Sequence, residues 1–146
     1  MSVDEDEVRR AVLSFPPGSA GGPDGLRPQH IRDMLTCQEA GTEFLSALTD
    51  FVNLVVAGRC PTDVDAVFFG GRLLALSKKT GGIRPIAIGF TLRRLTSKCA
   101  SAFGIEKLAP YFYPRQLGVG TAGGCDDLVI LNHSTVNHVT VKHLDI

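Results

Sequence analysis

Residues 71–89 carry the sequence GRLLALSKKTGGIRPIAIG, and this stretch sets the expected fold class. Two apolar runs flank the segment KKTGG, whose polar residues and paired glycines are typical of a turn. The first apolar run starts at Ala66 with two phenylalanines close behind, which predicts one or two extended strands before the turn. Pro85 cannot donate to a sheet ladder, so the second run favours an edge strand. The pattern therefore predicts a β-hairpin over residues 66–90, with lysines at its tip.

The charges are unevenly distributed along the chain, although its formal net charge at pH 7 is zero. Residues 1–65 hold 11 acidic and 5 basic side chains, whereas residues 66–105 hold seven basic side chains and no acidic one. The seven are Arg72, Lys78, Lys79, Arg84, Arg93, Arg94 and Lys98. A stretch with only positive charge is a candidate surface for phosphate groups. Charge alone is equally typical of a solvated face.

The composition excludes several classes of protein. A chain of 146 residues, 44% apolar and 21% charged, is long and apolar enough for one globular domain with a core. No apolar run reaches the roughly 18 residues of a membrane span, and the acidic start MSVDEDEVRR lacks the apolar region of a secretory signal. We therefore expect an intracellular protein without a membrane partner, in the nucleus or the cytoplasm. The four cysteines form no CxxC pair and are expected to be free thiols.

Apolar residues at spacings of three and four predict most of the remaining structure as helical. Helices are expected over residues 2–15, 29–35, 42–57 and 92–108. The segment PPGSAGGPDGLRP between the first two helices is a loop, because it holds nearly every turn-forming residue type. The expected boundary residues are Ser2 or Asp4 before the first helix, Gly58 after the third, Thr91 before the fourth, and Pro110 and Pro114 at its end. Together with the hairpin, these helices predict an α+β fold.

The last third of the chain contains a second glycine-rich loop, QLGVGTAGG, followed by an expected helix over 125–136 and a strand over 139–146. Its glycines, Gly118, Gly120 and Gly123, match the GxGxxG fingerprint of dinucleotide-binding folds. That fingerprint requires an apolar strand just before the first glycine, and the preceding PYFYPRQ contains two prolines. A Rossmann-like nucleotide-binding unit is therefore kept as one alternative.

Five segments, in their order along the chain, resemble the N-terminal part of the reverse transcriptase domain of non-LTR retrotransposons. They are GGPDGLRPQHI, the hairpin sequence GRLLALSKKTGGIRPIAIG, RRLTSK, FYPRQLGVGTAGG and VTVKHLDI. The similarity covers roughly residues 15–146, and GGIRPIAIG with the lysine pair before it is its most specific part. It implies the fingers subdomain of a right-hand polymerase, with the first edge of the palm, in a truncated domain. The single partial domain would comprise a helical part (1–65), the basic hairpin (66–90), a helix (91–114), and a glycine loop, helix and palm strand (115–146).

The resemblance also implies roles for individual residues. An RNA-directed DNA polymerase is a nucleotidyltransferase that must hold the charged triphosphate of the incoming nucleotide, a task that suits the planar guanidinium of arginine. By resemblance, Arg84 meets the triphosphate, with Lys78 or Lys79 beside it and Arg72 on the incoming strand. The residues expected to approach the RNA or DNA template-primer are Arg93, Arg94, Lys98, Gln116 and Gly118. The implied partners are thus nucleic acid and a nucleoside triphosphate.

Asp145 would be, again by resemblance, the first metal-binding aspartate of the palm. The full-length family uses Mg²⁺, and two-metal phosphoryl transfer needs several clustered carboxylates. Asp126 and Asp127 lie at an expected helix start, where acids are favourable caps, so they do not replace the paired aspartates of the palm. We therefore expect a chain that holds no metal and is inactive alone. A non-catalytic nucleic-acid-binding module that uses the same hairpin is the second alternative.

Overall fold

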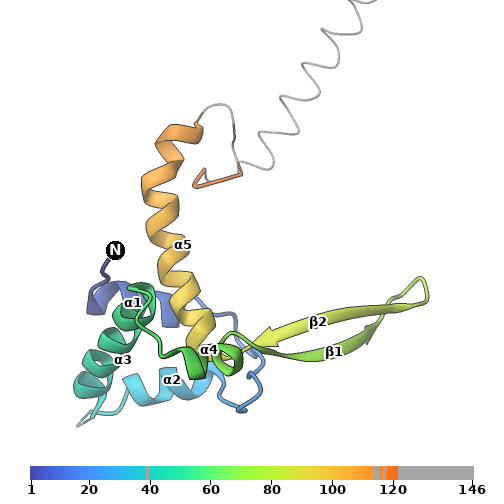
Figure 1. The fold of residues 1–146 in the computed structure, drawn as a ribbon, viewed down its shortest axis with the longest axis horizontal. Helices are drawn as coiled ribbons and strands as arrows, with labels where there is room; N and C mark the ends of the chain where they lie inside the picture. The colour runs from blue at the N-terminus through green and yellow to red at the C-terminus, as the bar shows by residue number, and fades with distance from the viewer. Residues whose placement is uncertain (39, 114–115, 117, 122–146) are drawn as a thin grey trace, which may run out of the picture. The chain divides into compact units, whose positions relative to one another are not determined.

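The computed structural model of the chain describes residues 1–38, 40–113, 116 and 118–121. Within this part of the chain, helices and a two-stranded antiparallel sheet follow one another as α1, α2, α3, α4, β1, β2 and α5 (Figure 1). Their bounds are Glu5–Leu13, Pro28–Leu35, Gly41–Val56, Thr62–Phe68, Gly71–Ser77, Ile83–Gly89 and Thr91–Phe112. The predicted α+β class is confirmed at this level. The helix and strand expected over 125–136 and 139–146 lie outside the described residues.

The chain divides into two compact units, Met1–Ala100 and Ser101–Ile146. The first unit holds the four N-terminal helices, the hairpin and the first turns of α5. Its core is formed by buried apolar residues from α1 and the segments on either side of it, and from α2, α3 and α5. These are Val3, Val8, Ala11, Val12, Phe15, Ile31, Leu45, Leu48, Val52, Leu95 and Cys99.

Helix α1 begins where the sequence predicts a cap. The Asp4 carboxylate accepts a 2.8 Å hydrogen bond from the backbone N–H of Glu7, and the Glu7 carboxylate accepts one of 2.8 Å from the N–H of Asp4. This reciprocal pair satisfies N–H groups that have no partner inside the helix. The predicted stripe of Val8, Ala11 and Val12 is buried. Local sequence is therefore sufficient to start α1 and to choose its inner face.

Helix α3 ends at the glycine predicted to end it. Gly58 has φ +69°, in the left-handed region that glycine enters without steric cost. The N–H of Arg59 then reaches back 3.1 Å to the carbonyl of Leu54, which is typical of a glycine-terminated helix. On the same helix, the Asn53 side chain donates to and accepts from the backbone of Val3, at 2.9 and 2.8 Å. The N-terminal segment is thereby fixed to α3.

The hairpin has the predicted turn. Strands β1 and β2 pair from Gly71↔Gly89 to Ser77↔Ile83. Beyond the last pair, the N–H of Lys78 donates to the Gly82 carbonyl at 3.0 Å, and the N–H of Gly81 donates to the Lys78 carbonyl at 3.1 Å. Both glycines have positive φ, 84° and 87°, so the paired glycines of KKTGG are required by the backbone of the turn.

The predicted start of the hairpin at Ala66 is wrong, because residues 62–68 form the unexpected helix α4. Pro61 precedes the helix, and two aspartates lie in its first turn, where their charge favours the helix dipole. The apolar residues of AVFF suggested a strand, but Phe68 instead packs against Phe51 and Phe90, with ring centroids 5.9 and 6.5 Å apart. β1 therefore starts at Gly71, after Gly70 closes the last turn of the helix.

Two predicted boundaries of α5 are also wrong. Pro110 does not end the helix, which continues to Phe112. A proline so close to a C-terminus removes only one helical hydrogen bond, and the carbonyl that loses it belongs to exposed Glu106. Thr91 does not act as the N-cap either, because the N–H of Arg94 bonds the carbonyl of Phe90 at 3.0 Å. The Thr91 hydroxyl instead donates to the carbonyl of Leu26.

Candidate functional site

The cationic face of the hairpin is the first part of the candidate site. Successive strand residues point to opposite faces, so the pairs Arg72↔Ile88, Leu74↔Ile86 and Leu76↔Arg84 share one face. Lys78, two positions after Leu76, continues this alternation at the start of the turn. The cationic face therefore combines Arg72, Arg84 and Lys78 with a strip of apolar side chains. Lys78 bonds the Gly82 carbonyl one step past the last strand pair, so Lys78 and Arg84 lie diagonally across the end of the hairpin.

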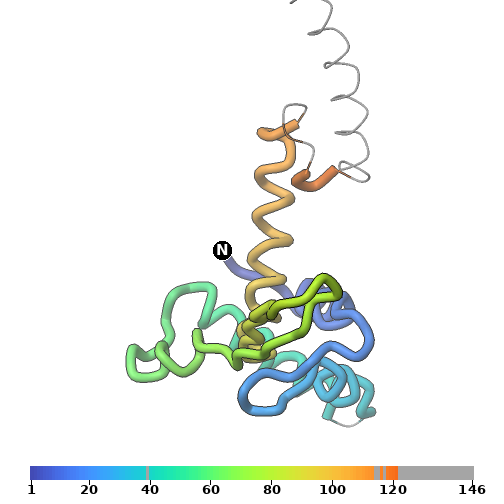
Figure 2. The backbone as a smooth tube through the Cα atoms, turned by 90° about the vertical axis from the view of Figure 1, so that its right-hand side faces the viewer, coloured from blue at the N-terminus to red at the C-terminus, as the bar shows by residue number. Residues whose placement is uncertain are grey.

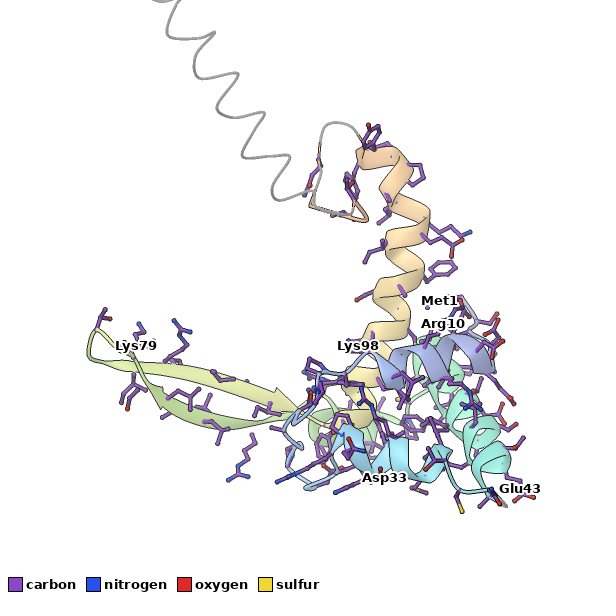
Figure 3. The ribbon with its side chains drawn as sticks, turned by 180° about the vertical axis from the view of Figure 1, so that it is seen from behind. Met1, Arg10, Asp33, Glu43, Lys79 and Lys98 are labelled. Atoms are coloured by element: carbon purple, nitrogen blue, oxygen red, sulfur yellow. The ribbon has the colours of Figure 1, made fainter. Side chains whose placement is uncertain are left out.

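The basic side chains of the hairpin are exposed to solvent. In the described part of the chain, the ion pair of Lys107 with Glu106 is the only one. Arg72, Lys78, Lys79 and Arg84 also make no side-chain hydrogen bond to another described residue. Figure 3 shows the position of Lys79 at the turn, far along the hairpin from the helices of the first unit. The hairpin thus presents four cations that no described carboxylate neutralises.

The opposite face of the hairpin is apolar and equally exposed. It carries Leu73, Ala75, Ile83, Pro85 and Ala87, and the same alternation adds one polar residue, Ser77, beside the turn. Leu73 and Ile83 are 71% and 67% exposed, values unusual for residues of this type. Both arginines in the strand register therefore lie on one face, and the two faces of the hairpin differ in chemistry.

The hairpin base, defined by Phe69, Gly89 and Phe90, is held by Arg93 of α5. The Arg93 guanidinium donates to the carbonyl of Phe69. It also lies directly over Gly89, where an added Cβ would be 2.7 Å from Nη2 of Arg93. Arg93 was predicted to approach nucleic acid, but the structure places this half-buried side chain against the protein backbone. Its role in this arrangement is to position the hairpin.

The loop between α1 and α2 contacts the same hairpin base, and the tube in Figure 2 shows its course. Gly22 is buried there, with the site of a missing Cβ 2.7 Å from Cα of Phe90 and 2.8 Å from the Gly89 carbonyl. Nearby, Arg94 donates a 2.7 Å hydrogen bond to the carbonyl of Ala20. Loop, hairpin base and the start of α5 therefore form one packed junction.

Arg94 and Lys98 also turn toward the protein. The guanidinium carbon of Arg94 lies 5.3 Å from the ring centroid of Phe15, and Nζ of Lys98 lies 4.9 Å from it. Both distances are typical of cation–π contacts. Arg32 contacts the backbone of the same residue, where its guanidinium donates to the carbonyl of Phe15. The sequence analysis did not select Arg32, because nothing in PQHIRDML distinguishes this arginine from an ordinary solvated helix residue.

The remaining predicted site residues belong to the second unit. Among its described residues, the N–H of Gly118 donates to the side-chain oxygen of Gln116. This contact folds Gln116 back onto its own loop. Asp145 lies outside the described residues. Within the described ranges, no three His, Cys, Asp or Glu side chains come together as a metal site.

Cys99 is the one described group whose pKa departs clearly from its ordinary value. Burial raises the pKa of this thiol, and the nearby Glu7 carboxylate raises it further. A raised pKa keeps the sulfur protonated at neutral pH and makes it a poor nucleophile. Cys99 is therefore a core residue, 3% exposed, whereas the free Cys37 is exposed.

The fold and the site define a small α+β protein with a cationic hairpin fixed at its base by arginine and glycine contacts. Neither a scan against models of protein families nor a search of curated proteins finds a match for this chain. No helix in the described ranges combines the length and the apolar character needed to span a membrane.

Proposed function

We propose that this chain is the fingers part of a reverse transcriptase of the non-LTR retrotransposon type, in which the hairpin contacts template nucleic acid and the incoming nucleoside triphosphate. The observation that carries the proposal is the shared face of Arg84 and Lys78, both exposed and free of ion pairs among the described residues. Two neighbouring cations without a carboxylate are suited to one polyphosphate chain.

The chemistry of each residue follows from its place. Arg84 lies within regular strand pairing, so its guanidinium starts from a fixed backbone and can grip two phosphate oxygens at once. Lys78 starts from the turn and acts as a point charge on a longer, more adaptable stem. Arg72 lies nearer the hairpin base on the same face and would contact a phosphate further along the nucleic acid. None of these residues performs bond-making chemistry, so the proposed contribution of the hairpin is binding and positioning.

A non-catalytic nucleic-acid-binding module is the second candidate, because the same cationic face would serve it. Binding of a nucleoside triphosphate distinguishes the two candidates. A polymerase module binds the triphosphate, whereas a non-catalytic nucleic-acid-binding module is not expected to bind it. The Rossmann-like alternative has less support, because the fingerprint requires a strand before Gly118 and the chain is helical from Thr91 to Phe112.

The experiment is a titration of a labelled single-stranded oligonucleotide, and separately of a nucleoside triphosphate, against the parent, Arg84→Ala and Arg84→Lys at two salt concentrations. A charge-assisted hydrogen bond contributes about 1.5–3 kcal/mol, so Arg84→Ala should weaken binding of both ligands by about tenfold or more. Arg84→Lys should lose less, because it keeps the charge. The slope of affinity against salt should also fall by about one unit in Arg84→Ala.

Arg59→Ala is a suitable control, since Arg59 is an exposed arginine outside the hairpin. Equal binding of both ligands by the parent and by Arg84→Ala would refute the proposed function. Binding of the oligonucleotide but not of the triphosphate, both through Arg84, would favour the non-catalytic module.

A further inference from the structure

Two cations of α5 share one aromatic ring. Arg94 and Lys98 lie one helical turn apart, and each approaches the ring of Phe15, the residue that follows the C-cap of α1. Arg94 also bonds the Ala20 carbonyl, and Nζ of Lys98 lies 3.1 Å from the hydroxyl of Ser14. Both side chains are half-buried. They are therefore held in place rather than extended into solvent.

A third cation reaches this place from α2. Arg32 donates to the carbonyl of Leu13 at 2.6 Å, to that of Val12 at 3.4 Å, and to that of Phe15. These carbonyls belong to the C-terminal end of α1, where the helix dipole favours positive charge. Arg32 is half-buried as well. Three cations from two helices thus converge on the segment that ends α1.

None of the three cations has a carboxylate partner among the described residues. Carbonyl oxygens and an aromatic face offer only partial charges, so three half-buried cations that contact residues 12–15 keep their formal charge without a described counter-ion. Like charges repel more strongly as water is removed. The Glu7 carboxylate acts on neighbouring Cys99, but it is engaged in the capping pair with Asp4.

A second lysine of α5 shows the usual way of compensating such a charge. Nζ of Lys107 lies 5.7 Å from the ring centroid of Phe103, and 3.3 Å from the carboxylate of Glu106. Lys107 and Lys98 thus make the same aromatic contact on the same helix. Only Lys107 has a neutralising anion supplied by the chain.

We propose that Arg32, Arg94 and Lys98 form a phosphate-binding site beside Phe15, in which a bound phosphate group supplies the missing negative charge. Each guanidinium has five N–H donors. The contacts above use only Nε and Nη2 of Arg32 and Nη1 of Arg94, so other N–H donors of both side chains are available to bind a phosphate group. Planar guanidinium groups and a lysine are the side chains that bind phosphate oxygens best. The site deepens the proposed function, on which it rests, by adding a phosphate contact away from the hairpin.

The test measures thermal unfolding of the whole chain at constant ionic strength while inorganic phosphate replaces chloride. Phosphate should raise the melting temperature of the parent. Lys98→Gln and Arg94→Gln should each weaken the apparent phosphate affinity by about tenfold, the loss expected for one charge-assisted contact. Lys107→Gln, the matched control, should leave the phosphate effect unchanged. Ser14→Ala removes the hydroxyl near Lys98 but keeps the charge, so it should retain phosphate binding.

The result that overturns the proposal is a melting temperature that does not respond to phosphate in the parent, or responds equally in the parent and in Lys98→Gln. The cations would then only fasten α5 to the end of α1. A lower melting temperature of Lys98→Gln in chloride does not affect this comparison, since the quantity measured is the change that phosphate causes.

Titration with a single-stranded oligonucleotide separates the two sources of phosphate and the two proposals. Weaker oligonucleotide binding in Lys98→Gln identifies the ligand as a nucleic-acid phosphate, and an effect on inorganic phosphate alone identifies a small anion; both support the site. Loss of oligonucleotide binding in Arg84→Ala, together with no effect of Lys98→Gln on either ligand, overturns the site and leaves the proposed function intact. The reverse pattern supports the site and removes the hairpin from the proposed function.

Discussion

Substitution of Gly22 by alanine tests the junction between the α1–α2 loop and the hairpin base. The new Cβ would lie 2.7 Å from Cα of Phe90, 2.8 Å from the Gly89 carbonyl oxygen and 3.0 Å from N of Phe90. All three atoms belong to the backbone, so no side chain can rotate away to make room. Either the loop or the hairpin base must move.

The expected cost follows from two opposing effects. Overpacking of this kind destabilises by about 1–3 kcal/mol. Alanine also restricts the unfolded chain, which stabilises by about 0.4–1 kcal/mol. We therefore expect a net loss of about 1–2 kcal/mol in the free energy of unfolding. For a unit of this size, that loss lowers the melting temperature by roughly 5–10 °C.

Gly104→Ala is a matched control, for which the expected change in the free energy of unfolding has the opposite sign. Gly104 lies inside α5, and a Cβ added there would meet nothing within 4 Å. Gly104→Ala should therefore stabilise by about 0.5–1 kcal/mol through helix propensity. The assay is urea and thermal unfolding of the parent and of both variants, followed by far-ultraviolet circular dichroism. A Gly22→Ala protein as stable as the parent, or shifted upward like Gly104→Ala, would refute the described junction.

Three further predictions concern other parts of the molecule. Arg32→Ala should lower the free energy of unfolding by about 1.5–3 kcal/mol in urea titrations, because the carbonyls of Leu13 and Phe15 lose a charged donor; an unchanged midpoint would exclude this role. The pKa of the Cys99 thiol is raised by burial and then by the Glu7 carboxylate, so the unfolded chain loses this proton first as the pH rises. Stability should hence fall as the pH rises past about 8.5, the ordinary pKa of a thiol, and it should fall by less in Cys99→Ala than in the parent; parallel slopes would contradict this. The purified chain should not extend a primer with template, nucleotides and Mg²⁺, since Asp145 alone cannot hold two metal ions; extension that withstands rigorous purification would overturn this expectation.

The local elements were largely predictable because their determinants are close together in the sequence. Asp4 and Glu7 start α1 within a single turn of chain, and Gly58 ends α3 by its own φ. The turn of the hairpin likewise needs only KKTGG. Prediction failed where a local preference was ambiguous: the apolar residues of AVFF suit a strand, but Pro61 and the aspartates of TDVD begin a helix.

The candidate site was predictable only in part. The acid-free stretch and the alternation of the hairpin residues point to a cationic surface. The register then places Arg72 and Arg84 on one face, and the bond of Lys78 to Gly82 extends that face to Lys78. Arg93 and Arg94 were expected to approach nucleic acid. Their contacts with the protein backbone could not be predicted, because helical periodicity says which residues share a face but not what covers that face. The contacts with Phe69 and Ala20 depend on residues 24 and 74 positions away.

The sequence by itself determined the class of every described element except α4, together with the start of α1, the end of α3 and the turn of the hairpin. It also determined the concentration of positive charge in residues 66–105. Each of these features depends on neighbours along the chain. Only the tertiary structure decided which cations stay exposed. Arg84 remains in solvent on a strand that pairs solely with its neighbour, whereas Arg32, Arg94 and Lys98 are drawn to carbonyls and to the ring of Phe15. The physical reason is that a long basic side chain binds whatever acceptors the folded backbone brings within reach, and those acceptors come from distant segments.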